Sequence, residues 1–185
     1  MRSAATAAAA FLFGAAAVFL FYSQPSATAF FTAGQAACLN GTAQALISPG
    51  TADELVQALD SAQRTIEVEM YVFTSSELKD ALVQAVQRGV RVRLILEPRV
   101  DSNLATAEFL ASKGVEVRWA TTDYANTHSK LAIIDGKKVL VGSINWSHSA
   151  LYANREAELL VENERLAQEF LAAFEQDWAQ ASAMK

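Results

Sequence analysis

Alternating apolar and polar positions divide most of the chain into short strands and amphipathic helices. The segment TIEVEMYVF, residues 65–73, alternates and is rich in β-branched and aromatic side chains, which predicts a strand. Apolar residues at helical spacing follow Ser75 or Ser76, either of which can cap a helix, and the pattern stops at Gly89. VRVRLILE, residues 90–97, predicts a second strand. This part of the chain therefore forms a strand–helix–strand unit.

The same patterns continue on both sides of this unit. Further expected strands are AQALIS, VEVRW, KLAIID, KKVLVGS and EAELLVE, and further helices are expected from Thr51 or Asp53 to about Gln63, from Asn103 to Lys113 and from near Asn163 onward. Four apolar residues recur along the last helix: Leu166, Phe170, Phe174 and Trp178. We interpret this stripe as core packing. The order of elements predicts an α/β fold, a mixed β-sheet with helices on both faces.

The first 29 residues have a different character. Arg2 is the only charged residue before Asp53, and an apolar run from Ala4 to Tyr22 follows it. A small-residue exit at Ala27-Thr28-Ala29 completes the pattern of a signal peptide, but the run is also long enough to be an uncleaved membrane anchor. Both interpretations predict export of the rest of the chain, as a periplasmic or secreted protein or one anchored to the membrane.

The rest of the chain is expected to be a linker and one domain. Residues 30–43 are uncharged and rich in small side chains, so we expect a linker there, and residues 44–185 then form a single domain. With 15 basic and 20 acidic residues, the formal net charge is −5, which argues against binding of nucleic acid by bulk charge alone. A local basic rim would have to come from Arg88, Arg91, Arg93, Arg99 and Arg118. Such residues are more often just a solvated face.

Polar residues that suit phosphate chemistry lie in the segment THSKLAIIDGKKVLVGSINW. His128 and Lys130 share one face of the first strand, and Ser143 and Asn145 share a face where the second strand ends. The Asp135-Gly136 pair between the strands is a strong hairpin signal. A hairpin brings the start of its first strand beside the end of its second. We therefore expect an imidazole, an ammonium, a hydroxyl and a carboxamide to converge at one edge of the sheet.

This set of groups matches the needs of a phosphate. Lys130 supplies a positive charge, Ser143 and Asn145 supply neutral donors, and Gly142 leaves room for a close approach. His128 would act as a nucleophile or as an acid and base. The chain has only two histidines, and the nearby acidic residues lack the spacing of metal ligands. We therefore predict no metal site and no cofactor.

The full pattern is His128-x-Lys130, four residues, Asp135, six residues and Gly142-Ser143-x-Asn145. It resembles the HKD motif of the phospholipase D superfamily. The following segment NWSHSALYANRE and the unit YVFTSSELKDALVQAVQRGVRVRLILE are also similar to single-motif members of that superfamily. Residues 44–180 as a whole resemble bacterial Nuc-type endonucleases and Zucchini-like phosphodiesterases, which implies the phospholipase D/nuclease-like sandwich fold.

The resemblance implies a metal-independent phosphodiester hydrolysis in which His128 forms a phosphohistidine. Glu156 would then orient the imidazole of His128. The residues that would hold the phosphoryl oxygens are Lys130, Ser143 and Asn145. Asp135 completes the catalytic motif, although its place at the hairpin turn favours a structural role.

The mechanism needs a second histidine, but one motif supplies only one. Short relatives pair two chains, so we expect a homodimer with the active site at its two-fold interface. His148 is the alternative within the chain, and we interpret it as a rim or packing residue. Trp146 is a candidate for substrate binding, and Tyr71 could line the same groove, with core packing open for both.

The motif leaves three functions open. A nonspecific endonuclease on DNA or RNA is favoured by the short chain, which has no long acyl-binding insertion. A phospholipase D or cardiolipin hydrolase, acting on membrane phospholipid, is favoured by the acidic balance and the apolar N-terminal segment. The third alternative is an inactive membrane-anchored protein that binds phosphate without turning it over.

Overall fold

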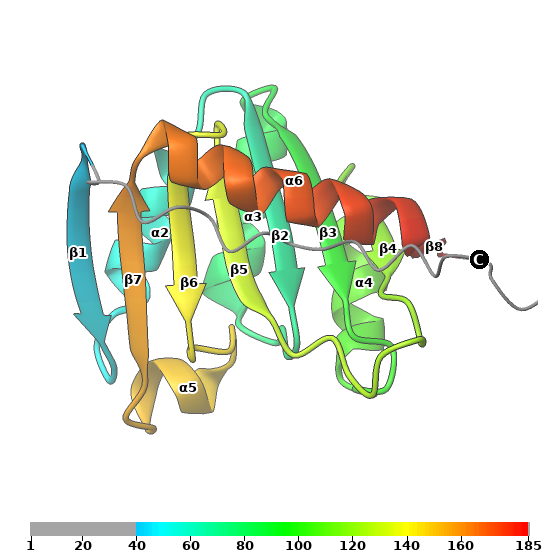
Figure 1. The fold of residues 1–185 in the computed structure, drawn as a ribbon. Coiled ribbons are helices and arrows are strands. Elements are labelled where there is room, and N and C mark those ends of the chain that lie inside the picture. Colours follow the sequence, from blue (N-terminus) through cyan, green and yellow to red (C-terminus); the bar gives the residue numbers. More distant parts are fainter. Residues whose placement is uncertain (1–39, 185) are drawn as a thin grey trace, which may run out of the picture. The chain divides into compact units, whose positions relative to one another are not determined.

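The computed structural model describes residues 40–184 (Figure 1). The expected leader at residues 1–29 lies outside the described residues, as does most of the expected linker. The linker prediction extends too far, because a strand begins at Thr42. Within residues 40–184, no helix combines the length and the apolar character that crossing a membrane requires.

The described chain forms one mixed sheet and the helices that cover it. The strands are β1 (Thr42–Ile47), β2 (Thr65–Met70), β3 (Arg91–Leu96), β4 (Glu116–Trp119), β5 (Lys130–Ile134), β6 (Lys138–Gly142), β7 (Ala157–Glu162) and β8 (Ser182–Ala183). The helices are α2 (Ala52–Asp60), α3 (Ser76–Gln87), α4 (Asn103–Ser112), α5 (His148–Tyr152) and α6 (Glu164–Gln180). The sequence predicted all of these except α5 and β8, which are too short for a periodic pattern.

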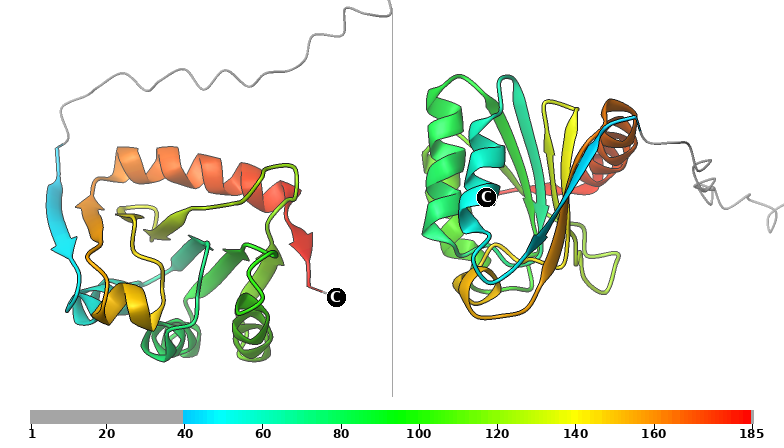
Figure 2. Two further views of the ribbon diagram at one scale, coloured as in Figure 1. Left: turned by 90° about the horizontal axis from the view of Figure 1, so that it is seen from below. Right: turned by 90° about the vertical axis from the view of Figure 1, so that its left-hand side faces the viewer.

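The sheet has eight strands in the order β1-β7-β6-β5-β2-β3-β4-β8. The pairs β2–β3 and β3–β4 are parallel, and all other pairs are antiparallel. Helices α2, α3, α4 and α5 lie on one face of the sheet, and α6 crosses the other (Figures 1 and 2). The expected mixed sheet with helices on both faces is confirmed.

Local capping explains where the main helices begin. The Oγ of Ser75 accepts a hydrogen bond from the N–H of Leu78 at 3.4 Å and caps α3. The Oδ1 of Asn163 accepts one from the N–H of Leu166 at 2.8 Å and caps α6. These side chains satisfy donors that have no partner within the helix, which is why a serine and an asparagine stand at these positions.

The predicted Asp-Gly hairpin joins β5 to β6. Asp135 and Gly136 both have positive φ, 54° and 63°, as a tight turn that follows the twist of the strands requires. Leu131 then pairs with Val141. The first residue of β5, Lys130, therefore lies beside the last residues of β6.

Apolar side chains fill both faces of the sheet. One cluster lies between the sheet and α2, α3 and α4, and a smaller one lies beneath α6. Phe174 is fully buried in the second cluster, where Phe170 and Trp178 pack against it. The interpretation of the α6 stripe as core packing is confirmed for these three residues, while Leu166 is only half-buried.

Candidate active site

The two halves of the motif meet at one end of the sheet. His128 lies just before β5, and Ser143 and Asn145 lie just after β6. This end of the strands is the lower edge in Figure 1, next to α5. The hairpin register brings them together, as the sequence predicts.

The exposed imidazole of His128 lies against the buried ammonium of Lys130. The Nζ of Lys130 is 3.0 Å from Nδ1 of His128 and donates to its carbonyl oxygen at 2.8 Å. The ring of Tyr71 lies 4.2 Å from the imidazole and 4.9 Å from Nζ, measured to its centroid. Burial lowers the pKa of Lys130, and the carboxylates nearby oppose this shift. The site thus offers a reachable nucleophile beside a desolvated cation.

Ser143 is held by the carboxylate of Glu156. Its Oγ donates to Oε2 of Glu156 at 2.6 Å and accepts the N–H of Ala157 at 3.1 Å. The second carboxylate oxygen accepts from Nδ2 of Asn154 at 3.1 Å. The bond from Ser143 and then that from Asn154 lower the pKa of Glu156. We expected Glu156 to orient His128, but within this chain its carboxylate holds Ser143 instead.

Asn145 carries an unused acceptor. Its Oδ1 is buried and has no hydrogen-bond partner among residues 40–184. Buried polar atoms are nearly always paired in folded proteins, and exceptions gather where a ligand binds. Because Oδ1 is an acceptor, it is the Nδ2 amide of this side chain that would donate to an anionic oxygen.

Two other candidates from the sequence have structural contacts of their own. Asp135 sits at the opposite end of β5, where its carboxylate accepts the N–H groups of Gln63, Arg64 and Thr65 at 2.7–3.0 Å. It fastens the start of β2 to the hairpin and does not meet the catalytic set. Trp146 is only 1% exposed and packs edge-on against Phe73, which is the core-packing alternative, and its buried Nε1 has no hydrogen-bond partner within residues 40–184.

The remaining polar candidates also have local partners. His148 is exposed at the start of α5, with its ring 5.1 Å from that of Tyr152. The arginines do not form a common basic rim, because each meets its own partners: Arg88 with Asp60, Arg91 with Glu116, Arg93 with Glu67 and Glu175, Arg99 with Glu97, and Arg118 over the ring of Trp178.

Sequence reasoning missed residues that position the loop before His128. The fully buried Glu97 accepts the N–H of Thr127 at 2.6 Å and the N–H of Arg99 at 3.0 Å. Nδ2 of Asn103 donates to the carbonyl oxygen of Glu97 at 3.0 Å. A carboxylate at the end of a buried strand, just before Pro98, was the signal in the sequence. Polar residues at the ends of such strands commonly serve a site.

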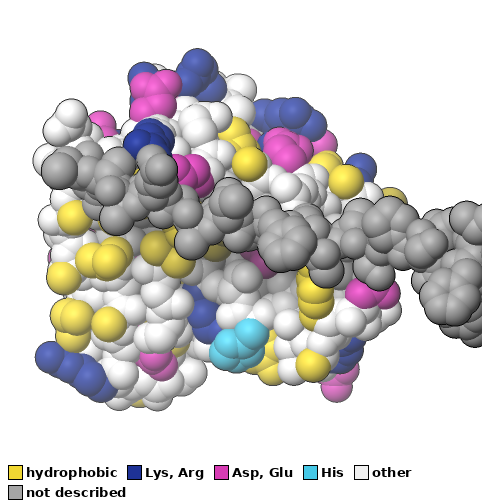
Figure 3. Space-filling model, viewed as in Figure 1, with side chains coloured by type: hydrophobic (Ala, Val, Ile, Leu, Met, Phe, Trp, Pro, Cys, Tyr) yellow, Lys and Arg dark blue, Asp and Glu magenta, His cyan; other side chains and the backbone are white. Residues whose placement is uncertain are grey.

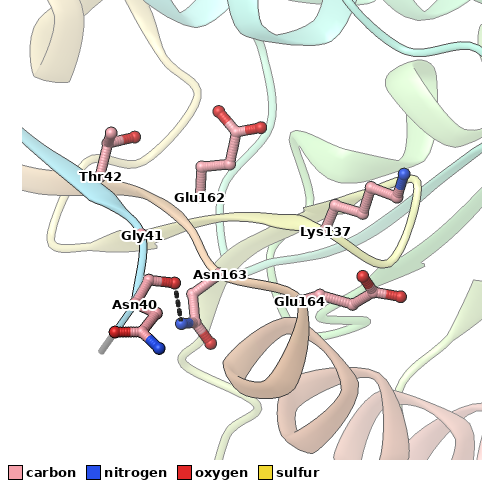
Figure 4. A pocket seen from close by; sticks show the side chains of 7 residues that line it. All are labelled: Asn40, Gly41, Thr42, Lys137, Glu162, Asn163 and Glu164. Atoms are coloured by element: carbon pink, nitrogen blue, oxygen red, sulfur yellow. Dashed lines mark hydrogen bonds between the residues drawn. The ribbon is translucent and has the colours of Figure 1, made fainter. Parts of the chain in front are cut away.

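A cavity of about 350 Å³ lies at the other end of the sheet, where α6 begins (Figure 4). Its lining consists of Asn40, Gly41, Thr42, Lys137, Glu162, Asn163 and Glu164. Nδ2 of Asn163 donates to the carbonyl oxygen of Asn40 at 2.9 Å across it. The lining contains no histidine or cysteine, and none of the residues of the HKD motif belongs to it.

Comparison with known proteins relates this geometry to a family. The model of the family described as "Cardiolipin synthase, PLD-like domain" matches residues 55–178. A mitochondrial cardiolipin hydrolase from Canis lupus familiaris is 35% identical, over 71% of this chain and 52% of its own length. A phospholipase D from Rickettsia prowazekii is 35% identical, over 67% of this chain and 58% of its own. The chain thus spans little more than half the length of these relatives.

Solved structures give the same result. The phospholipase D family member Nuc from Salmonella typhimurium superposes with a TM-score of 0.74 and 28% sequence identity, covering 78% of this chain and 99% of Nuc. NucT from Helicobacter pylori, at 19% identity and a TM-score of 0.70, shares the fold.

Proposed function

This chain belongs to the phospholipase D-like family, and from that premise we propose that it hydrolyses phosphodiesters through a phosphohistidine on His128. One observation carries the proposal. The exposed imidazole lies beside the buried Lys130 ammonium, at the sheet end where Ser143 and Asn145 also lie. A nucleophile, a cation and two neutral groups are what transfer of a phosphoryl group requires.

The reaction proceeds in two displacements. A ring nitrogen of His128 attacks phosphorus, the bond to the leaving oxygen breaks, and a second histidine gives that oxygen its proton. Water then attacks the phosphohistidine, the second histidine takes the proton from the water, and His128 is released with a phosphate monoester. Lys130, Ser143 and Asn145 hold the non-bridging oxygens as charge builds on them.

We propose that the second histidine is His128 of another copy of the chain. The two histidines of this chain are His128 and His148, and His148 contacts Tyr152 instead of the catalytic set. Apolar side chains are exposed on the sheet beside α6, over β1 and β7 (Figure 3). Ile47 is 39% exposed there and Leu159 46%. Such a face supports a two-fold dimer.

The substrate that we favour is DNA or RNA, cut without sequence preference. Nuc, at 28% identity, is matched over nearly its whole length, so a domain of this size is sufficient for a member of this family. The absence of a long insertion for acyl chains within the described residues also favours a polar, extended substrate.

A membrane phospholipid is the second candidate. The arginines that were expected to form a basic rim are engaged by partners of their own, and the formal net charge is −5. The exposed apolar side chains over β1 and β7 are compatible with a lipid surface, and relatives at up to 35% identity are named cardiolipin hydrolases and phospholipases D. An inactive phosphate-binding protein remains the third alternative.

Hydrolysis by the purified full-length chain in EDTA separates these functions. Labelled single-stranded DNA, RNA and cardiolipin vesicles are offered in parallel to the wild type, to His128→Ala and to Lys130→Ala. Cleavage of nucleic acid that survives EDTA and is lost with His128→Ala supports the nuclease. Release of phosphatidic acid with nucleic acid untouched supports the lipid hydrolase, and phosphate binding without any turnover supports the binding protein.

His148→Ala is the matched control for the loss of an imidazole. It removes an exposed histidine that does not contact the catalytic set, so activity is expected to remain. If this variant is as inactive as His128→Ala, the second histidine comes from the same chain and the shared site is wrong.

We also propose that the N-terminal segment takes the domain out of the cytoplasm. Its sequence has the charge and apolar pattern of a signal peptide or an anchor. Intact-mass analysis of the exported protein tests this: a chain that starts at Phe30 supports cleavage, and a full-length membrane-bound chain supports the anchor. A full-length chain in the cytosol would contradict export.

A further inference from the structure

A buried carboxyl group that the mechanism does not use lies directly behind the site. Lys130, Gly142 and Glu158 stand on β5, β6 and β7, where Leu131 pairs with Val141 and Gly142 pairs with Glu158. Lys130 is 6% exposed and Glu158 is 3% exposed. Lys130 lowers the pKa of Glu158, and Glu158 raises that of Lys130, so the acid and the ammonium share one buried region at the strand ends.

Gly142 leaves space for this acid. A Cβ atom at position 142 would lie 2.5 Å from Oε2 of Glu158, a distance at which the carboxyl group would have to move. The sequence suggested that Gly142 makes room for a phosphate, but the space beside it is taken by β7. A Cβ atom would also clash with the carbonyl oxygen of Ala157 and lie 2.7 Å from the Cα of Glu158. The glycine therefore lets β7 approach β6 closely at this point, with the Glu158 carboxyl group next to position 142.

Glu158 also supports the turn that carries the neutral donors. Its Oε2 accepts the N–H of Ile144 at 3.3 Å. Ile144 is fully buried and lies between Ser143 and Asn145. This bond fixes the backbone at the centre of the turn, so the two flanking side chains keep their direction toward the site.

Few charged groups surround Glu158. Burial is the largest influence on it and raises its pKa to about 8, with Lys130 lowering the pKa and Glu156 raising it. Its partner on β1 is the apolar Leu46, and its partner on β6 is Gly142. The raised pKa favours the protonated acid near neutral pH, and in that form Glu158 leaves the charge of Lys130 available to an anion.

We propose that Glu158 is a positioning residue of the active site, which fixes the Ser143–Asn145 turn and keeps the Lys130 charge for the phosphoryl group. The inference rests on the proposed function, because it is the substrate that brings the phosphoryl group. While Glu158 is protonated, a phosphoryl oxygen meets Lys130 without a competing carboxylate. Once Glu158 ionises, its negative charge pairs with Lys130 and repels the substrate.

Glu158→Gln tests this role in the full-length chain. Glutamine keeps the size of the side chain and an acceptor for the N–H of Ile144, but it cannot ionise. KM and kcat are measured from about pH 6 to about pH 9.5. The KM of the wild type is expected to rise on the order of tenfold as the pH passes about 8, whereas the KM of the variant stays nearly level.

Two further variants separate positioning from stability. Glu162→Gln neutralises an exposed carboxylate at the other end of β7 and should keep the pH profile of the wild type. Glu158→Ala removes the acceptor as well, and its kcat should fall on the order of tenfold while circular dichroism shows a folded chain. Identical pH profiles for the wild type and Glu158→Gln would overturn the proposal.

Binding of inorganic phosphate, followed by calorimetry, distinguishes this proposal from the proposed function. If the wild type hydrolyses no phosphodiester, but its phosphate affinity falls above about pH 8 more steeply than that of Glu158→Gln, the hydrolase is wrong and the role of Glu158 stands. Equal pH dependence in both proteins, or no phosphate binding at all, overturns the role of Glu158.

Discussion

At the scale of single residues, the site depends on the contrast between an exposed imidazole and a buried ammonium two positions apart. Lys130 is desolvated by the sheet, while His128 stands before the strand and remains open to solvent. A cation in a site with little water interacts more strongly with an anion than one at the surface. One short segment of the motif therefore carries both a solvent-accessible nucleophile, His128, and a desolvated cation, Lys130.

Ser143→Ala should lower kcat by about 10- to 100-fold, because it removes a hydroxyl whose oxygen the N–H of Ala157 holds in place and whose proton turns from Glu156 to a phosphoryl oxygen when substrate binds. Steady-state kinetics in EDTA measures this loss. Ser149→Ala, which removes an exposed hydroxyl on α5, is the matched control. An unchanged kcat in Ser143→Ala would show that the hydroxyl does not hold the phosphoryl group.

Asp135→Asn should lower stability and leave catalysis intact. Burial opposes ionisation of Asp135, but three backbone N–H groups outweigh it and lower its pKa. Its contribution is thus present above the unfolded value of 3.8 and is lost as the pH falls through the lower folded pKa. Urea unfolding at neutral pH should show a loss of about 1–2 kcal/mol. Lost turnover at full stability would instead give Asp135 a catalytic role.

At the scale of elements, a pair of carboxyl groups connects α6 to β2. Glu69 on β2 and Asp177 on α6 influence the pKa of one another, and Ser129, just before β5, lowers that of Glu69. Burial raises the pKa of Glu69 to about 7 and also raises that of Asp177. The two carboxyl groups therefore titrate as a linked pair.

Glu69→Gln should reduce the loss of stability between about pH 4.5 and about pH 7. Because the folded pKa is raised above the reference value of 4.5, the folded chain is stabilised below that value and loses this contribution as the pH rises through about 7. Chemical unfolding at about pH 5, 6.5 and 8 should show a flatter dependence in the variant than in the wild type. Glu169→Gln on the exposed side of α6 is the control, and parallel curves for Glu69→Gln and wild type would contradict the prediction.

At the scale of the whole molecule, the proposed two-fold dimer would bury the apolar face over β1 and β7. Leu159→Glu places a charge in that face, so the detergent-solubilised protein should become monomeric and lose activity by about tenfold or more. Light scattering and turnover measure the two effects. Leu104→Glu, on the 53% exposed side chain of α4, is the control. A monomeric Leu159→Glu with full activity would exclude the shared site.

The sequence by itself determined the elements and the central half of the site. Apolar periodicity is a local property, so it located the main strands and helices, and the Asp-Gly turn fixed the register of β5 and β6. Because a hairpin is a local structure, its turn signal alone is enough to place His128 and Lys130 beside Ser143 and Asn145. Short elements such as α5 give no periodic signal and were missed.

Only the tertiary structure decided which side chains surround that core of the site. Glu156 meets Ser143 across thirteen positions, Glu97 meets Thr127 across thirty, and Glu158 reaches the Lys130 region because β7 pairs with β6. Such contacts depend on the order of the strands in the sheet and on the space that a glycine leaves open. The apolar periodicity of the sequence predicts neither of these. The burial of Trp146 has the same origin, since its partner Phe73 comes from the loop after a distant strand. The catalytic residues of one hairpin can therefore be predicted from the sequence. The charge and position of the residues that support them depend on packing between segments far apart in the chain.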